Sequence, residues 1–289
     1  MGIKNEIERF DKRFFEEIIE IDAVTDSAGF GGGKGSSDLL WGASIDLIAW
    51  KLHSEEKITE EKYILETLVD DEGLKKIREV IHKDSIVRLK VSKCIDDSLN
   101  YFKLVEVIDA SYKDSQLDKI LKEYLKPVFY EDEVLGRMKL DNQFDSFQSD
   151  IKWINSDVSI SLQNDDDEEI FKGYISTAHE LYKNQQDWNR RILDYAAEEL
   201  LDLANDWYKE SREEYYDYFD PDFEEEDPFF KEEEVTKERF AGLIEISEFY
   251  VGSDGNFEAY CTDGDIFCGH SIIVSGNING QFEEAQMAG

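Results

Sequence analysis

The sequence predicts an α+β protein in two parts, an N-terminal mixed α/β domain over residues 1–126 and a C-terminal antiparallel β domain over residues 127–289. Three observations predict this class. Before residue 126, helical spacings of apolar residues alternate with β-branched runs. After Val134, short apolar runs are separated by turns that contain glycine. A helical, acidic segment at about 168–238 lies between two such blocks, so we expect it to be an insertion in the β domain.

The first part is expected to contain five helices and two strands. In residues 4–21 apolar residues recur every three or four positions, which predicts an amphipathic helix. Residues 39–52 are apolar nearly all round and predict a buried helix. The other helices are expected at 59–69, 72–82 and 115–125, the last closed by Pro127. Strands are expected at 85–91 and 101–108, which are rich in β-branched and aromatic residues.

The second part is expected to consist of strands around one long helical pattern. Val158, Ile160 and Leu162 alternate with serines, which is typical of a half-buried strand. The helical pattern extends over 170–208, and the acid-rich 164–169 leads into it. Strands are expected at 134–140, 147–154, 158–162, 240–250, 256–262, 266–267, 271–275 and 281–286, with hairpin turns at 253–255 and 277–280.

Residues 207–230 combine bulky aromatics with a dense run of carboxylates and are the main candidate site. Thirteen of the twenty-five residues from 210 to 234 are acidic, and only Arg212 and Lys231 oppose them. A solvated acidic segment has few aromatics, so we expect either partner binding or packing of the rings into the chain's own core. The predicted partner-binding residues are Trp207, Tyr215, Tyr216, Tyr218, Phe219, Phe223, Glu224, Glu225, Glu226, Phe229 and Phe230.

The charge balance limits the classes of partner. The chain has 68 acidic and 32 basic side chains, a net charge of −36, which repels nucleic acid and anionic membranes. This charge favours a basic protein surface as the partner, although acidity can also serve solubility alone. Three cysteines without disulfide spacing, a charged N-terminus and the absence of a long apolar run predict a soluble cytoplasmic protein.

Two segments resemble ligand sites without completing a motif. The glycine-rich segment 26–38 has Gly35 where a phosphate-binding loop requires Ser or Thr, and Ala28 where it requires its first glycine. It is expected to be flexible, or ordered by a ligand.

The second segment places Cys261, Asp263, Asp265, Cys268 and His270 within ten residues, but no second Cys/His pair completes a zinc site. The alternative for this segment is a structural hairpin. No nucleophile elbow or paired-histidine motif occurs either, so we predict no catalytic residue, no cofactor and no metal.

Two blocks resemble the domain-of-unknown-function 2262 family, whose members are mostly uncharacterised bacterial and phage proteins. The likeness lies in 135–162 and 263–289 and is carried by Gly136, Leu140, Asp141, Phe147, Trp153, Asp265, Phe267, Gly269, His270, Ser275, Gly276 and the terminal Ala288-Gly289. The resemblance implies no catalytic residues. In length and overall character the chain is also similar to phage anti-defence proteins that inhibit the Gabija system, which coat a nuclease complex as oligomers.

Taken together, these features predict a non-enzymatic, acidic interaction protein. The expected function is a phage-encoded inhibitor that blocks a nucleic-acid-handling defence complex of the Gabija kind, without binding nucleic acid or membranes itself. A homo-oligomer is expected, because apolar surface is left over by one small β domain. The alternative is a bacterial cytoplasmic enzyme or ligand-binding protein that uses the glycine-rich loop 29–35 or the Cys268/His270 hairpin.

Overall fold

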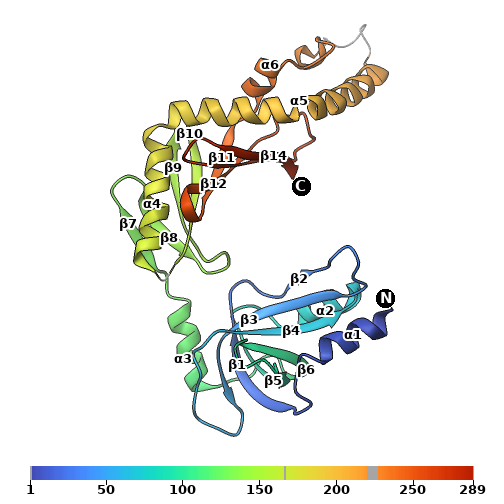
Figure 1. Ribbon diagram of the computed structural model, residues 1–289, viewed down its shortest axis with the longest axis vertical. Coiled ribbons are helices and arrows are strands. Elements are labelled where there is room, and N and C mark those ends of the chain that lie inside the picture. The colour runs from blue at the N-terminus through green and yellow to red at the C-terminus, as the bar shows by residue number, and fades with distance from the viewer. Residues whose placement is uncertain (1, 166, 220–226, 289) are drawn as a thin grey trace. The chain divides into compact units, whose positions relative to one another are not determined.

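The computed structural model describes residues 2–165, 167–219 and 227–288, and the chain forms two compact units (Figure 1). The first unit comprises Met1–Pro127 with Asn142–Phe144, and the second comprises Val128–Asp141 with Asp145–Gly289. Each unit combines helices with a sheet, which confirms the predicted α+β class. Within these ranges no helix has both the length and the apolar character needed to span a membrane.

The first unit is built on a six-stranded sheet that closes on itself. The strand order is β1-β5-β6-β4-β3-β2, and β1 also pairs with β3. Five strands therefore form a small barrel, and β2 extends it at one edge. The strands are β1 (Ile19–Thr25), β2 (Gly31–Gly33), β3 (Trp41–Leu52), β4 (Tyr63–Val69), β5 (Ile86–Lys93) and β6 (Tyr101–Asp109).

Three helices accompany the barrel. They are α1 (Ile3–Asp11), α2 (Asp71–Val80) and α3 (Ser115–Tyr124). Helix α2 connects the third and fourth barrel strands, and β4 runs parallel to β6, as in five-stranded barrels of the OB type. This barrel serves many unrelated functions, so the topology alone assigns none. The barrel interior is filled by side chains that are fully buried, among them Ile21, Leu47, Leu65, Leu89 and Phe102.

Two predicted helices in this unit are wrong, because 39–52 forms strand β3 and 59–69 contains strand β4. In β3 every second residue from Ala43 to Lys51 is buried, but the intervening positions include Ile48 and Trp50. Apolar residues on both faces hide the two-residue period, and the run then resembles a buried helix. The predicted helix 4–21 is also wrong after Asp11, because β1 begins at Ile19 and pairs with β3 and β5.

The second unit is an eight-stranded sheet with helices inserted at its centre. The order is β14-β13-β12-β11-β10-β9-β8-β7, and all neighbours are antiparallel except β10 and β11. The strands are β7 (Phe129–Asp132), β8 (Gly136–Asp141), β9 (Ser146–Trp153), β10 (Ser156–Gln163), β11 (Ile246–Val251), β12 (Asn256–Cys261), β13 (Ser271–Asn277) and β14 (Phe282–Ala288).

Helices α4 (Glu168–Lys183), α5 (Gln185–Tyr218) and α6 (Lys237–Leu243) all lie between β10 and β11 in the chain. The predicted helical insertion is therefore present. It also explains the parallel pair, since parallel neighbours require a long crossover. Helices α4 and α5 lie along the sheet in Figure 1, and they cover the side chains that alternate inward from its strands. Phe249, Val251, Phe257 and Ala259 on this face are at most 2% exposed.

One predicted strand of the second unit is wrong in its first part, and another is wrong altogether. The predicted strand 240–250 begins instead as helix α6, whose N-cap is Thr236, and its hydroxyl oxygen accepts the N–H of Arg239. Strand β11 follows only from Ile246. The predicted strand 266–267 lies in a loop, where Ile266 and Phe267 are buried.

Candidate functional site

The negative charge of the chain is concentrated in the second unit. The first unit has 27 acidic and 20 basic side chains, whereas the second has 41 acidic and 12 basic ones. The net charges are therefore −7 and −29. A partner recognised through charge is expected to bind the second unit.

The most acidic part of this unit is built on the C-terminal end of α5 and the segment that returns from it. We call residues 207–219 together with 227–234 the acidic arm. Helix α5 has 34 residues and is therefore about 50 Å long. Its earlier part contacts β13 and β14, whereas Glu210, Glu213, Glu214 and Asp217 near its end are exposed.

Tyr208 fastens the returning segment to α5. Its side chain is 1% exposed, and its hydroxyl donates to the carbonyl oxygen of Phe229 at 2.7 Å and lies 3.0 Å from that of Glu232. The Tyr208 ring stacks on Phe230, with 5.9 Å between centroids. The rings of Trp207 and Phe267 meet edge to face at 5.8 Å, which ties the same part of α5 to the sheet core. These contacts fix the part of the acidic arm around Trp207 and Tyr208 to the core of the second unit.

A second group of rings continues toward the end of the helix. Tyr215 stacks on Phe230 with 4.7 Å between centroids and on Phe219 with 5.3 Å. The Tyr216 hydroxyl donates to the carbonyl oxygen of Phe230, and the Arg212 guanidinium lies over the Tyr216 ring. These rings are half-buried against one another. They stabilise the arm, and part of each ring stays exposed to solvent.

Tyr218 differs from the other aromatic residues of the arm. It is 83% exposed, the highest value among the exposed large hydrophobic side chains of the described residues. Exposed glutamates lie one turn before it on α5. An exposed aromatic ring among carboxylates can supply contact area while the charges attract a basic surface.

The predicted site residues thus fall into three groups. Trp207, Phe229 and Phe230 pack against the core, and Tyr215, Tyr216 and Phe219 form the half-buried stack. Of the predicted site residues that the structure describes, Tyr218 alone is largely exposed. Phe223, Glu224, Glu225 and Glu226 lie outside the described residues.

Three residues that organise the arm are absent from the predicted set. They are Tyr208, Arg212 and Arg239. The Arg212 Nε donates to the carbonyl oxygen of Phe230 at 3.0 Å, and Arg239 donates to that of Phe229 and lies over the Tyr208 ring. Tyr208 and Arg212 share one helix face with the predicted Tyr216 by their four-residue spacing, and this spacing is the signal that could have identified these two residues.

The cluster around Cys268 and His270 is a structural loop. The buried carboxylate of Asp263 accepts the backbone N–H groups of Phe267 at 2.9 Å and of Gly269 at 2.8 Å. His270 interacts with the carbonyl oxygen of Phe267 through Nδ1, and its ring lies edge-on to Trp207. Cys261 is buried, which raises the pKa of its thiol to about 12. Among the residues described, no group of His, Cys, Asp and Glu side chains has a metal-binding arrangement.

The glycine-rich segment is partly a strand. Gly31–Gly33 pairs with β3, and Phe30 before it is buried in the barrel core. A phosphate-binding loop leads from a strand into the N-terminus of a helix, whereas this segment leads into β3. The structure therefore gives it no phosphate-binding geometry of that kind.

The two units and the acidic arm define a strongly acidic α+β protein. The chain belongs to the family described as "Uncharacterized protein conserved in bacteria (DUF2262)", whose model matches residues 132–287. The resemblance predicted from the two sequence blocks is thereby confirmed. A second model, "Domain of unknown function (DUF7021)", matches residues 6–124. No curated protein and no solved structure matches the chain.

Proposed function

We propose that this chain is an interaction protein whose acidic arm binds a basic surface on another protein. The observation that carries the proposal is the arm itself, in which Tyr218 is 83% exposed beside exposed carboxylates. The internal contacts of Tyr208 and Tyr215 support it, because a preorganised element loses less entropy when it binds.

Among possible partners with a basic surface, a nucleic-acid-handling enzyme matches the acidic arm best. Such enzymes carry clusters of Lys and Arg that contact phosphates, and a surface with a net charge of −29 complements them. An acidic protein that covers this surface excludes nucleic acid by competition. We therefore propose that the protein inhibits a defence nuclease complex, and that it is encoded by a phage and acts in the bacterial cytoplasm as a homo-oligomer.

The alternative function, a ligand site at the glycine-rich loop or at Cys268 and His270, has less support. The first segment pairs as a strand, and the second is held by Asp263.

The proposal is tested by affinity capture from a lysate of the native host, with the full chain as bait. We expect a basic protein to be recovered and, once purified, to bind Tyr218→Ala at least tenfold more weakly, or about 1.4 kcal/mol. Phe144→Ala is the matched control, because Phe144 is 66% exposed and belongs to the first unit. Equal affinities for wild type and Tyr218→Ala, or recovery of no basic protein, would contradict the proposal.

A further inference from the structure

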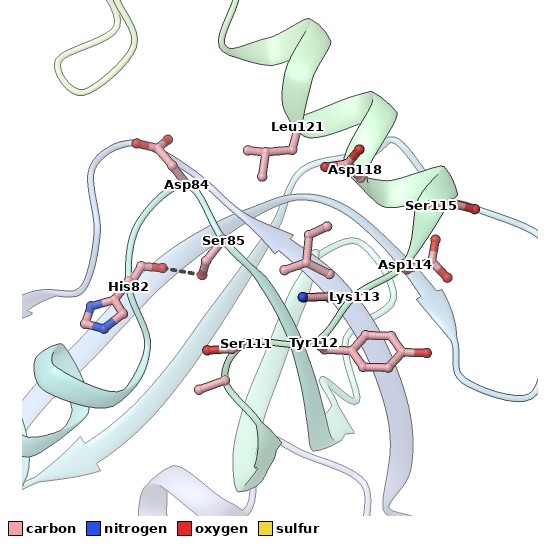
Figure 2. A pocket seen from close by; sticks show the side chains of 12 residues that line it. His82, Asp84, Ser85, Ser111, Tyr112, Lys113, Asp114, Ser115, Asp118 and Leu121 are labelled. Atoms are coloured by element: carbon pink, nitrogen blue, oxygen red, sulfur yellow. Dashed lines mark hydrogen bonds between the residues drawn. The ribbon is translucent and has the colours of Figure 1, made fainter.

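The first unit contains a cavity that the acidic arm does not involve. Its volume is about 660 Å³, which lies within the usual range of ligand pockets. It is bounded by the segment that leads from α2 into β5, by the loop between β6 and α3, and by α3 itself (Figure 2). Ile86, Ala110 and Leu121 supply apolar surface, and hydroxyl and charged groups complete the lining.

The loop between β6 and α3 is fixed on both sides of Lys113. The Tyr112 ring lies under the Arg88 guanidinium, with 3.8 Å from Cζ to the ring centroid. Asp114 accepts from the buried Lys51 Nζ at 2.5 Å and from the backbone N–H groups that begin α3. Two anchored neighbours thus hold the backbone of Lys113 in place. Figure 2 shows the Lys113 side chain extending into the pocket on the side of Ser85 and Ser111.

The carboxylates around the cavity already have partners. Asp84 accepts from the Ser27 hydroxyl at 2.6 Å, Asp118 pairs with Lys122 at 2.5 Å, and Asp114 pairs with Lys51. Within the described residues, Lys113 makes neither a hydrogen bond nor an ion pair, and the only other titratable lining group that could be cationic is His82. The cavity therefore has one ammonium group that no protein group pairs with; it is exposed to solvent and lies next to apolar surface.

We propose that this cavity binds a small organic monoanion, namely a carboxylate attached to an apolar body. Lys113 binds the carboxylate, and the apolar body covers Ile86 and Leu121. A single ammonium group matches one negative charge, and charge-assisted hydrogen bonds of this kind are among the stronger polar contacts. Asp84, Asp114 and Asp118 line the same cavity and repel any anion, but they repel a dianion such as phosphate about twice as strongly as a monoanion.

The test uses the full chain with N-acetyl-tryptophan as the anionic probe and N-acetyl-tryptophanamide as its neutral counterpart. We expect calorimetry to show that the anion binds at least tenfold more tightly than the amide. Amide chemical shifts should change at Ser111, Lys113 and Ser85. Lys113→Met should weaken binding of the anion at least tenfold and leave that of the amide unchanged, whereas Lys113→Arg should retain it.

Lys119→Met is the matched control, because it removes an exposed lysine of α3 that does not line the cavity. It should bind both probes as the wild type does. Equal affinity of Lys113→Met and wild type for N-acetyl-tryptophan would overturn the proposal. So would equal affinity for the two probes, binding of inorganic phosphate as tight as that of the anion, or no binding of N-acetyl-tryptophan.

Discussion

Replacement of Tyr208 by Ala should destabilise the second unit by about 3–5 kcal/mol, the range for deleting a large buried aromatic side chain. Tyr208 is 1% exposed and joins α5 to the segment that returns toward α6. Its loss leaves a cavity beside the rings of Phe229 and Phe230 and removes the single hydroxyl donor that the carbonyl oxygens of Phe229 and Glu232 share. A urea titration followed by circular dichroism measures the change.

Two further variants distinguish the contribution of the Tyr208 ring to stability from that of its hydroxyl, and from the effect of substituting an exposed residue of the acidic arm. Tyr208→Phe keeps the ring and should cost only about 1–2 kcal/mol, because only the hydrogen bond is lost. Tyr218→Ala should change stability by less than about 0.5 kcal/mol, since that side chain is 83% exposed. If Tyr208→Ala were as stable as the wild type, the packing of Tyr208 against Phe229 and Phe230 would be wrong.

Asp26→Asn should stabilise the first unit above pH 6, by on the order of 1–3 kcal/mol. Burial raises the pKa of Asp26 from 3.8 to about 6, and the charge of nearby Asp46 adds to the effect. The folded state therefore binds a proton more tightly than the unfolded state does. The stability of the wild type consequently rises as the pH falls from about 6 toward 4, as far as this group is concerned.

The pH dependence distinguishes this mechanism from a general effect of the substitution. Asn is neutral at every pH and can still accept the N–H of Gly29, which donates to the Asp26 carboxylate at 3.3 Å. The stability difference between Asp26→Asn and the wild type should be full at pH 7–8, should shrink as the pH falls through 6 toward 3.8, and should vanish only below about pH 3, where Asp26 is protonated in both states. Unfolding titrations across this range measure it. A constant difference at all pH values would show that the Asp26 charge is not its cause.

The sequence predicts the strands best where apolar and polar residues alternate. In β10 the apolar residues of Val158–Leu162 alternate with serines, although Ser161 is itself buried, and in β12 buried positions alternate with half-buried ones. Strand β3 is apolar on both faces, and the two-residue period is then lost. The α1 prediction extends too far because Ile18 and Ile21 continue the helical spacing by chance, although Ile21 pairs in the sheet.

The candidate site could be located from composition, but its internal order could not. The mixture of acids and aromatics identifies 207–230 as unusual. Which ring packs inward depends on contacts with Phe267 and with the carbonyl oxygens of the returning segment, which are distant in the chain. The cavity around Lys113 could not be predicted from the sequence, because its lining residues come from separate parts of the first unit.

The association rate of the captured basic partner, measured against salt concentration, shows whether the acidic arm attracts that partner by its charge. Removing three exposed charges with Glu213→Gln, Glu214→Gln and Asp217→Asn should slow association about tenfold at low salt and flatten its salt dependence.

The matched control removes three exposed carboxylates of the first unit, Glu55, Glu56 and Glu60, by substitution with Gln. It changes the net charge by the same amount but leaves the arm intact. If the arm attracts the partner, this control should associate at the wild-type rate, and the arm variant should associate slowly with little dependence on salt. Equal rates and equal salt slopes for the two variants would show that the arm has no special role in association.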